Sequence, residues 1–253
     1  MSAGNPIEAD VVAEGKRLLA RAQETGVALR LLGGVAIYLR APAELALAFA
    51  RPYNDLDFVT AKRSARAAAS FFRDQGYEPH VAFNALHGQE RLLFFDFEHD
   101  RQVDVFVGAF AMSHRVPLDE RLDLDAVSIP LAELLLTKLQ IAELNEKDVR
   151  DALALLHDHP VGDSDGETVN AARVAELCAS DWGLWRTITA NLLACRAFAD
   201  TYDIPDRETL DERVDALLAR IEAAPKTRSW KLRAKIGDRK RWYELPEEVA
   251  GGP

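Results

Sequence analysis

Cysteine is nearly absent from this chain: Cys178 and Cys195 are the two that occur among 253 residues. Two thiols cannot build a disulfide framework or a four-thiolate zinc site. Both lie in apolar helical stretches, so we expect buried free thiols of the kind found in reducing compartments. No run of about 18 apolar residues occurs, and the first residues lack the basic start and apolar run of a signal peptide. We therefore expect a cytoplasmic protein that makes no membrane contact.

Basic residues are in the minority, with 31 Lys and Arg against 41 Asp and Glu, a formal net charge of −10. This balance argues against a protein coated with basic surface for duplex DNA, although it does not exclude a local basic patch. Hydrophobic residues at 48% and charged residues at 28% are ordinary globular values, which excludes wholesale disorder. The length suits one large domain or two modest ones.

Hydrophobic periodicity predicts an α/β half followed by an all-helical half. In the first half we expect helices over 7–25, 35–49 and 61–75 and strands over 27–32, 55–59, 77–85, 91–98 and 102–108. After about residue 125 the pattern becomes helical, over 131–144, 146–157, 168–179, 183–200 and 207–223. The sequence thus predicts an α/β domain over 1–125 and a helical domain over 126–253.

Three acidic residues lie in two of the predicted strands. Asp55 and Asp57 are two residues apart, so on a strand they point to one face with α-carbons about 6.6–6.8 Å apart. Asp104 lies between Val103 and Val105, where an acid is costly unless a cation compensates it. Three carboxylates that converge from neighbouring strands would hold a pair of Mg²⁺ ions roughly 3.5–4 Å apart.

A glycine pair, Gly33-Gly34, follows the first predicted strand and precedes a predicted helix. A turn without β-carbons lets backbone N–H groups approach phosphate oxygens, and the helix N-terminus favours their negative charge. The pair alone is weak evidence. The glycine turn, the acid pair about twenty residues later and the strand acid together favour a nucleotide-phosphate site.

These segments resemble a known family when they are taken together. Leu31-Leu32-Gly33-Gly34-Val35-Ala36, Arg51-Pro52-Tyr53-Asn54-Asp55-Leu56-Asp57-Phe58-Val59 and Val103-Asp104-Val105-Phe106 resemble motifs of the DNA polymerase β-like nucleotidyltransferase superfamily. Residues 137–151, with Lys138, Lys147-Asp148 and Asp151, are similar to the bacterial AbiEii-type branch of abortive-infection toxins. The resemblance covers about residues 28–158.

The resemblance implies a nucleotidyltransferase fold, in which a mixed sheet has flanking helices. It also implies transfer of a nucleoside monophosphate from an NTP to a hydroxyl group, with release of pyrophosphate. It implies that Gly33 and Gly34 form the phosphate turn and that Asp55 and Asp57 bind two Mg²⁺ ions, with Mn²⁺ as a substitute. Asp104 would complete the metal site on the nucleophile side and act as general base. Many members have Gly-Ser at the turn, so the hydroxyl contact to phosphate is missing here.

Two basic residues complete the implied nucleotide site. Lys138 would contact the triphosphate as a point charge, and Arg51, four residues before the acid pair, could reach a phosphate. Their alternatives are an ordinary helix-surface lysine and a surface-loop arginine. Asp96 and Glu98 compete with Asp104 as the third acid, but Asp96 precedes a predicted hairpin and is not in mid-strand, which favours Asp104.

The segment 226–243 carries a local excess of positive charge. It has one acid, Asp238, and eight basic residues: Lys226, Arg228, Lys231, Arg233, Lys235, Arg239, Lys240 and Arg241. Trp230, Trp242 and Tyr243 lie among them, a pattern that suits phosphate contact and base stacking on RNA. The rest of the chain has 23 basic and 40 acidic residues. The alternative is therefore a tail that docks on its own acidic body or on a second copy.

The acceptor of the nucleotidyl group separates the functional hypotheses. A toxin-like enzyme would modify RNA, such as a tRNA end, or a protein hydroxyl, and would have an antitoxin partner or a second copy of itself. The alternative enzyme would modify a small-molecule antibiotic. A non-catalytic nucleotide-binding or interaction protein on the same fold is the third hypothesis, and the three acids argue against it.

Overall fold

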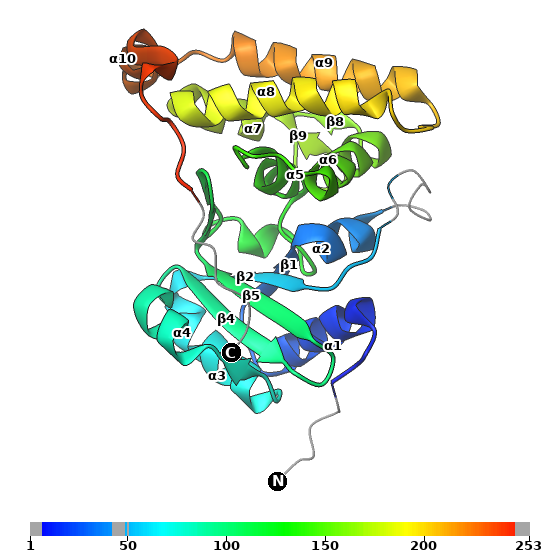
Figure 1. The fold of residues 1–253 in the computed structure, drawn as a ribbon, viewed down its shortest axis with the longest axis vertical. Coiled ribbons are helices and arrows are strands. Elements are labelled where there is room, and N and C mark those ends of the chain that lie inside the picture. The colour runs from blue at the N-terminus through cyan, green and yellow to red at the C-terminus, as the bar shows by residue number, and fades with distance from the viewer. Residues whose placement is uncertain (1–6, 42–48, 50, 246–253) are drawn as a thin grey trace. The chain divides into compact units, whose positions relative to one another are not determined.

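The computed structural model describes residues 7–41, 49 and 51–245, which form two compact units (Figure 1). The first unit comprises the described residues within 1–42, 51–110 and 117–130. The second comprises those within 43–50, 111–116 and 131–253. The domain boundary at residue 125 stays a prediction from the sequence.

A five-stranded mixed sheet forms the centre of the first unit, with strand order β1-β2-β5-β4-β3. The strands are β1 (Leu29–Leu32), β2 (Leu56–Thr60), β3 (Glu78–Pro79), β4 (Arg91–Asp96) and β5 (Arg101–Val107). The β2–β5 pair is parallel and the other pairs are antiparallel. This sheet confirms the predicted α/β fold class.

Helices flank the sheet: α1 (Val11–Glu24), α2 (Gly33–Arg40), α3 (Ala65–Asp74) and α4 (Val81–His87), with a 3₁₀ turn over Lys62–Ser64. Alternate residues of a strand point to the same side of the sheet. On one side of this sheet those residues include the buried aromatic rings of β2 and β4. On that face the ring of Phe58 lies 5.6 Å from that of Phe72 in α3, and Phe72 stacks on Phe94 at 5.1 Å. Burial of these rings fixes which residues of β2, β4 and β5 point to the opposite face.

The strand predicted over 77–85 is wrong beyond Pro79, because the chain forms helix α4 there. His80 caps this helix by accepting a hydrogen bond from the Phe83 N–H through Nδ1, at 3.2 Å. The Asn84 amide then bonds to the backbone of Leu93 in both directions, at 2.7 and 3.0 Å. These side-chain hydrogen bonds hold helix α4 against strand β4. The sequence predicted a strand and a hairpin turn for the residues that form this helix.

Helices make up most of the second unit, as predicted: α5 (Leu131–Leu139), α6 (Glu146–Asp158), α7 (Ala171–Ser180), α8 (Trp182–Ala199), α9 (Arg207–Ala223) and α10 (Arg228–Ile236). Helix α5 ends at Leu139, five residues earlier than the pattern predicted. The Asn191 side chain in α8 donates to the carbonyls of Leu139 and Ile141, at 2.8 and 2.7 Å. These bonds satisfy carbonyls that have no partner at a helix C-terminus.

Short elements complete the described chain: β6 (Ala109–Ala111), β7 (Arg115–Pro117), β8 (Val161–Gly162), β9 (Val169–Asn170) and 3₁₀ turns over Leu122–Leu124 and Gly237–Arg239. None of the helices within the described residues is long and apolar enough to cross a membrane.

A buried carboxylate in α1 ties the N-terminal end of the first unit to its core. Glu14 is fully buried and accepts hydrogen bonds from the Tyr77 hydroxyl at 2.6 Å, from Arg17 Nε at 2.7 Å and from the Glu8 N–H at 3.0 Å. Burial raises the pKa of Tyr77 strongly, so this hydroxyl stays a donor. The network satisfies a charge that would otherwise be costly to bury.

Candidate active site

The predicted acids Asp57 and Asp104 lie on adjacent strands. They are register partners in the parallel β2–β5 pair, and Asp57 is also the partner of Leu32 in β1. Because Phe58 and Phe94 occupy the apolar face, alternation places Asp57, Asp104, Gln102 and Arg91 together on the opposite face. We call these four residues the acidic face.

Asp55 lies one residue before β2 and is exposed. The strand predicted over 55–59 therefore begins one residue later than expected, and Asp55 lies outside the β2 ladder. The rival acid Asp96 is paired with His99, whose Nδ1 lies 2.8 Å from its carboxylate. Asp96 is two residues beyond Phe94 in β4, which places it on the apolar side of the sheet, whereas Glu98 is exposed beyond the end of that strand. The position of Asp104 thus differs from those of both its rivals.

Gly33 lies directly against the Asp57 carboxylate. It begins α2 with φ of +71°, a conformation that L side chains rarely adopt, and a β-carbon there would overlap Asp57 Oδ2. Gly34 has an ordinary φ, but a β-carbon there would meet Arg51 Nη2 and would approach the Tyr53 ring to 2.8 Å. The glycine pair thus allows an acid and a guanidinium to approach the backbone at the start of a helix.

Arg51 is held beside this turn by aromatic contact. Its guanidinium carbon lies 4.6 Å from the centre of the Tyr53 ring, and Tyr53 lies 5.8 Å from Tyr38 in α2. A guanidinium next to a helix N-terminus adds to the positive potential that binds phosphate there. The first unit therefore brings Gly33, Gly34 and Arg51 together with the Asp57 side of the acidic face.

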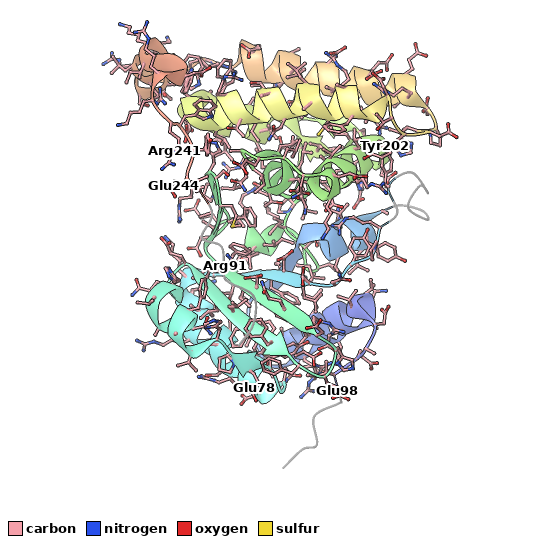
Figure 2. All side chains as sticks on the ribbon, viewed as in Figure 1. Glu78, Arg91, Glu98, Tyr202, Arg241 and Glu244 are labelled. Carbon is pink, nitrogen blue, oxygen red and sulfur yellow. The ribbon has the colours of Figure 1, made fainter. Side chains whose placement is uncertain are left out.

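Asp104 is paired with cationic and polar donors of its own sheet. Its Oδ1 accepts a 2.6 Å bond from Arg91 Nε, and its Oδ2 accepts a 2.7 Å bond from Gln102 Nε2. The Arg91 guanidinium lies over the rings of Phe106 and Phe83, at 5.3 and 5.6 Å (Figure 2 labels Arg91). Arg91 thus supplies the cation that an acid in an apolar strand requires.

Sequence reasoning missed Arg91, although a signal for it was present. Strands β4 and β5 form a hairpin in which Asp96 pairs with Arg101, so counting back places Leu93 opposite Asp104. Arg91 is then the diagonal neighbour of Asp104 on the same face, and such a neighbour is within reach of a long side chain.

No group of three or more His, Cys, Asp or Glu side chains that could hold a metal ion occurs within the described residues. Carboxylate oxygens suit Mg²⁺, and Asp57 and Asp104 are adjacent. Both oxygens of Asp104 already accept bonds from protein donors. The carboxylates thus suit a divalent cation by residue type, but Asp104 would have to give up a protein donor to bind one. Metal binding by Asp55, Asp57 and Asp104 stays a prediction.

Lys138, in the second unit, is half-buried and belongs to an ion-pair triad with Asp148 and the buried Asp151. Its Nζ lies 3.3 Å from Asp148 and 2.9 Å from Asp151, so α5 and α6 bring together three of the four residues of the predicted motif, while Lys147 is exposed. This pairing fixes the position of the ammonium group. Nucleotide binding by Lys138 stays a prediction.

The two cysteines are free and buried in the second unit, in agreement with the prediction of buried thiols. Burial raises the pKa of both Cys178 and Cys195 to about 12. Neither is therefore a thiolate near neutral pH, and a cysteine nucleophile can be set aside.

The chain has structural similarity to proteins of known structure, although its sequence matches no protein-family model and no curated protein. Among solved structures, the chain is similar to an antigenic nucleotidyltransferase-like protein from Paracoccidioides brasiliensis, with a TM-score of 0.42 and 12% sequence identity. The match covers 88% of this chain and 97% of that one.

Proposed function

We propose that the chain is a nucleotidyltransferase that moves a nucleoside monophosphate from an NTP to a hydroxyl acceptor and releases pyrophosphate. One observation carries the proposal: Asp57 and Asp104 are register partners on parallel strands, and Asp57 lies against the glycine pair that begins α2. This arrangement offers carboxylates and phosphate-binding backbone N–H groups within one neighbourhood.

In the proposed reaction, the acceptor oxygen attacks the α-phosphorus, and the bond from that phosphorus to the bridging oxygen of pyrophosphate breaks. Mg²⁺ held by Asp55, Asp57 and Asp104 would supply charge neutralisation for the triphosphate and a lower pKa for the attacking hydroxyl. The N–H groups of Gly33 and Gly34 orient the phosphates.

Asp104 accepts the proton of the hydroxyl in this proposal, after one of its two present donors has moved away. Gln102 Nε2 is the easier of the two to move, because it belongs to a neutral and half-buried side chain. Arg91 stays close as a cation that stabilises negative charge developing at the α-phosphate.

We infer an AbiEii-type enzyme from residues 137–151, because Lys138, Asp148 and Asp151 form one ion-pair triad, as expected for a motif that acts together. The acceptor would then be RNA or a protein hydroxyl, and an antitoxin or a second copy would be the partner. A small-molecule antibiotic remains the alternative acceptor.

A non-catalytic nucleotide-binding protein is the second candidate, and one observation favours it. Arg91 and Gln102 occupy both oxygens of Asp104, as expected for an acid retained only for structure. Transfer activity separates the two candidates.

The test is transfer of α-³²P-labelled NTPs to total RNA and total protein by wild type, Asp57→Asn, Asp104→Asn and the control Glu98→Gln. Glu98 is an exposed acid just beyond β4 and outside the acidic face. We expect Asp57→Asn and Asp104→Asn to abolish transfer while Glu98→Gln retains it. Full activity of the Asp57→Asn/Asp104→Asn double variant would overturn the proposal.

A further inference from the structure

The two tryptophans of the C-terminal segment, Trp230 and Trp242, pack against helix α8 of the second unit. The ring of Trp230 lies 5.1 Å from Trp185, and the ring of Trp242 lies 6.0 Å from Trp182 in α8. The Trp242 indole also donates to Thr187 Oγ1 at 3.1 Å. Two aromatic residues that the sequence assigned to base stacking thus anchor the segment within the second unit.

Most of the basic side chains of the same segment are exposed to solvent. Six of them are exposed and form no ion pair with any residue of the described chain: Arg228, Lys231, Lys235, Arg239, Lys240 and Arg241. Charges gathered in this way repel one another unless an anion compensates them. Anchored aromatics and unpaired cations together form a fixed positive surface.

Helix α10 arranges three of these cations in a row. Arg228, Lys231 and Lys235 follow the spacing i, i+3, i+7, so they share one helical face over about 10 Å. A row of this length spans more than a single phosphate and suits a polyanion.

Beyond α10 the chain borders a cavity of about 490 Å³. Arg115, Lys240 and Arg241 line it with the aromatic ring of Tyr243 and the buried His114 (Figure 2 labels Arg241 and Glu244 of this segment). The cavity thus offers exposed cations and an aromatic wall, the combination that accommodates one phosphate with its base.

The acids near this cavity do not cancel its charge. Asp181 is engaged as the N-cap of α8, where it accepts hydrogen bonds from the N–H groups of Gly183 and Leu184 at 2.7 and 3.1 Å. Glu244 is the other acid of the lining. Both carboxylates are exposed, so the three exposed cations Arg115, Lys240 and Arg241 outnumber two acids in the lining.

Arg233 holds the backbone of the segment in place. Its guanidinium lies 4.5 Å from the centre of the Trp182 ring and donates to the carbonyls of Gly237 and Lys240, at 2.8 and 2.7 Å. Lys240 and Arg241 are therefore presented from an ordered turn, which reduces the entropy lost when an anion binds.

We propose that Arg115, Arg228, Lys231, Lys235, Arg239, Lys240 and Arg241, here called the cationic surface, bind the phosphodiester backbone of a single-stranded nucleic acid. One nucleotide enters the cavity against Tyr243. A strand fits better than a free nucleotide, because the cations continue along α10 beyond the cavity. Duplex DNA is disfavoured because the whole chain carries a net charge of −10. The inference goes beyond nucleotidyl transfer and stands without it.

Fluorescence anisotropy with labelled oligouridylate and oligothymidylate tests this proposal. The variant Lys231→Gln/Lys235→Gln/Lys240→Gln/Arg241→Gln removes four exposed charges. The control Arg63→Gln/Arg66→Gln removes two exposed charges from the first unit. The pairs Lys231→Gln/Lys235→Gln and Lys240→Gln/Arg241→Gln repeat the test if the fourfold variant fails to fold.

We expect the fourfold variant to bind at least ~10-fold more weakly at low salt, with a salt slope smaller by roughly 3, since each lost contact removes about 0.7 for single strands. The control should bind like wild type. The two oligonucleotides show whether the strand is RNA or DNA, and both results support the surface. Equal binding by wild type and the fourfold variant would overturn the proposal. Competition by free UMP as strong as that by the strand, or binding to anionic phosphatidylserine vesicles alone, would also overturn it.

Discussion

The Arg91–Asp104 pair makes a testable link between the stability of the sheet and divalent-cation binding. Replacing Arg91 with Met keeps an apolar stem against Phe83 and Phe106 but removes the charge that compensates Asp104. The side chains of Arg91 and Asp104 are 17% and 6% exposed, so the change leaves a nearly buried carboxylate that keeps its hydrogen bond from Gln102 but has lost its cation.

Breaking a buried ion pair from one side costs 3–5 kcal/mol, and the partial exposure of Arg91 favours the lower end, about 3 kcal/mol. For a chain of this size that corresponds to a fall in melting temperature of roughly 6–12 °C. A divalent cation should then compensate the carboxylate in the variant. We therefore expect Mn²⁺ to raise the melting temperature of Arg91→Met more than that of wild type.

Thermal denaturation followed by circular dichroism, with and without Mn²⁺, measures both effects. Arg91→Lys is the matched control, because it keeps the charge while losing the planar fork, and it should lie between the other two proteins. A metal-free melting temperature of Arg91→Met equal to that of wild type would refute the pairing argument. Equal Mn²⁺ shifts in both proteins would refute the link to the cation.

Three further predictions concern other residues. Gly33→Ala should abolish NTP binding by calorimetry, because its β-carbon would displace the Asp57 carboxylate. Gly26→Ala, with the same φ of +71° but open space around it, should cost only about 1–2 kcal/mol and leave binding unchanged; equal binding by both variants would contradict the clash. Glu14→Gln should lower the free energy of unfolding in urea by about 3 kcal/mol, because it removes the charge that compensates buried Arg17; a loss below about 0.5 kcal/mol would contradict a role for this network. Burial lowers the pKa of His114 from its usual 6.5, so the unfolded chain binds more protons in acid, and the free energy of unfolding should fall as pH drops below about 6.5. His114→Asn should flatten that dependence in urea titrations, and an unchanged profile would contradict it.

The sequence predicted the parts of the site that depend on local pattern. The two-residue spacing of Asp55 and Asp57 and the apolar flanks of Asp104 predicted strand acids; Asp57 lies in β2 and Asp104 in β5, whereas Asp55 comes one residue before β2. The glycine pair was predicted from turn chemistry, and the structure adds its physical reason, the close approach of Asp57 and Arg51.

The remaining features depend on contacts between distant segments. Helix α4 replaced a predicted strand because Asn84 bonds to the backbone of Leu93, a contact that no local pattern encodes. The partner of Asp104 required the hairpin register, and the anchoring of Trp242 required the tertiary position of α8. The charge pattern could not show whether the C-terminal segment packs on its own unit or stays exposed. In the structure its tryptophans pack on helix α8, and six of its basic side chains are exposed.

Calorimetric titration of the four NTPs, with and without Mg²⁺, into wild type and Asp55→Asn/Asp57→Asn tests the central claim most directly. The proposed site predicts binding of at least one NTP to wild type that requires Mg²⁺ and is lost in the double variant while its circular dichroism spectrum is unchanged. Absence of NTP binding to folded wild type, or equal binding to the double variant, would contradict a nucleotide site built on these carboxylates.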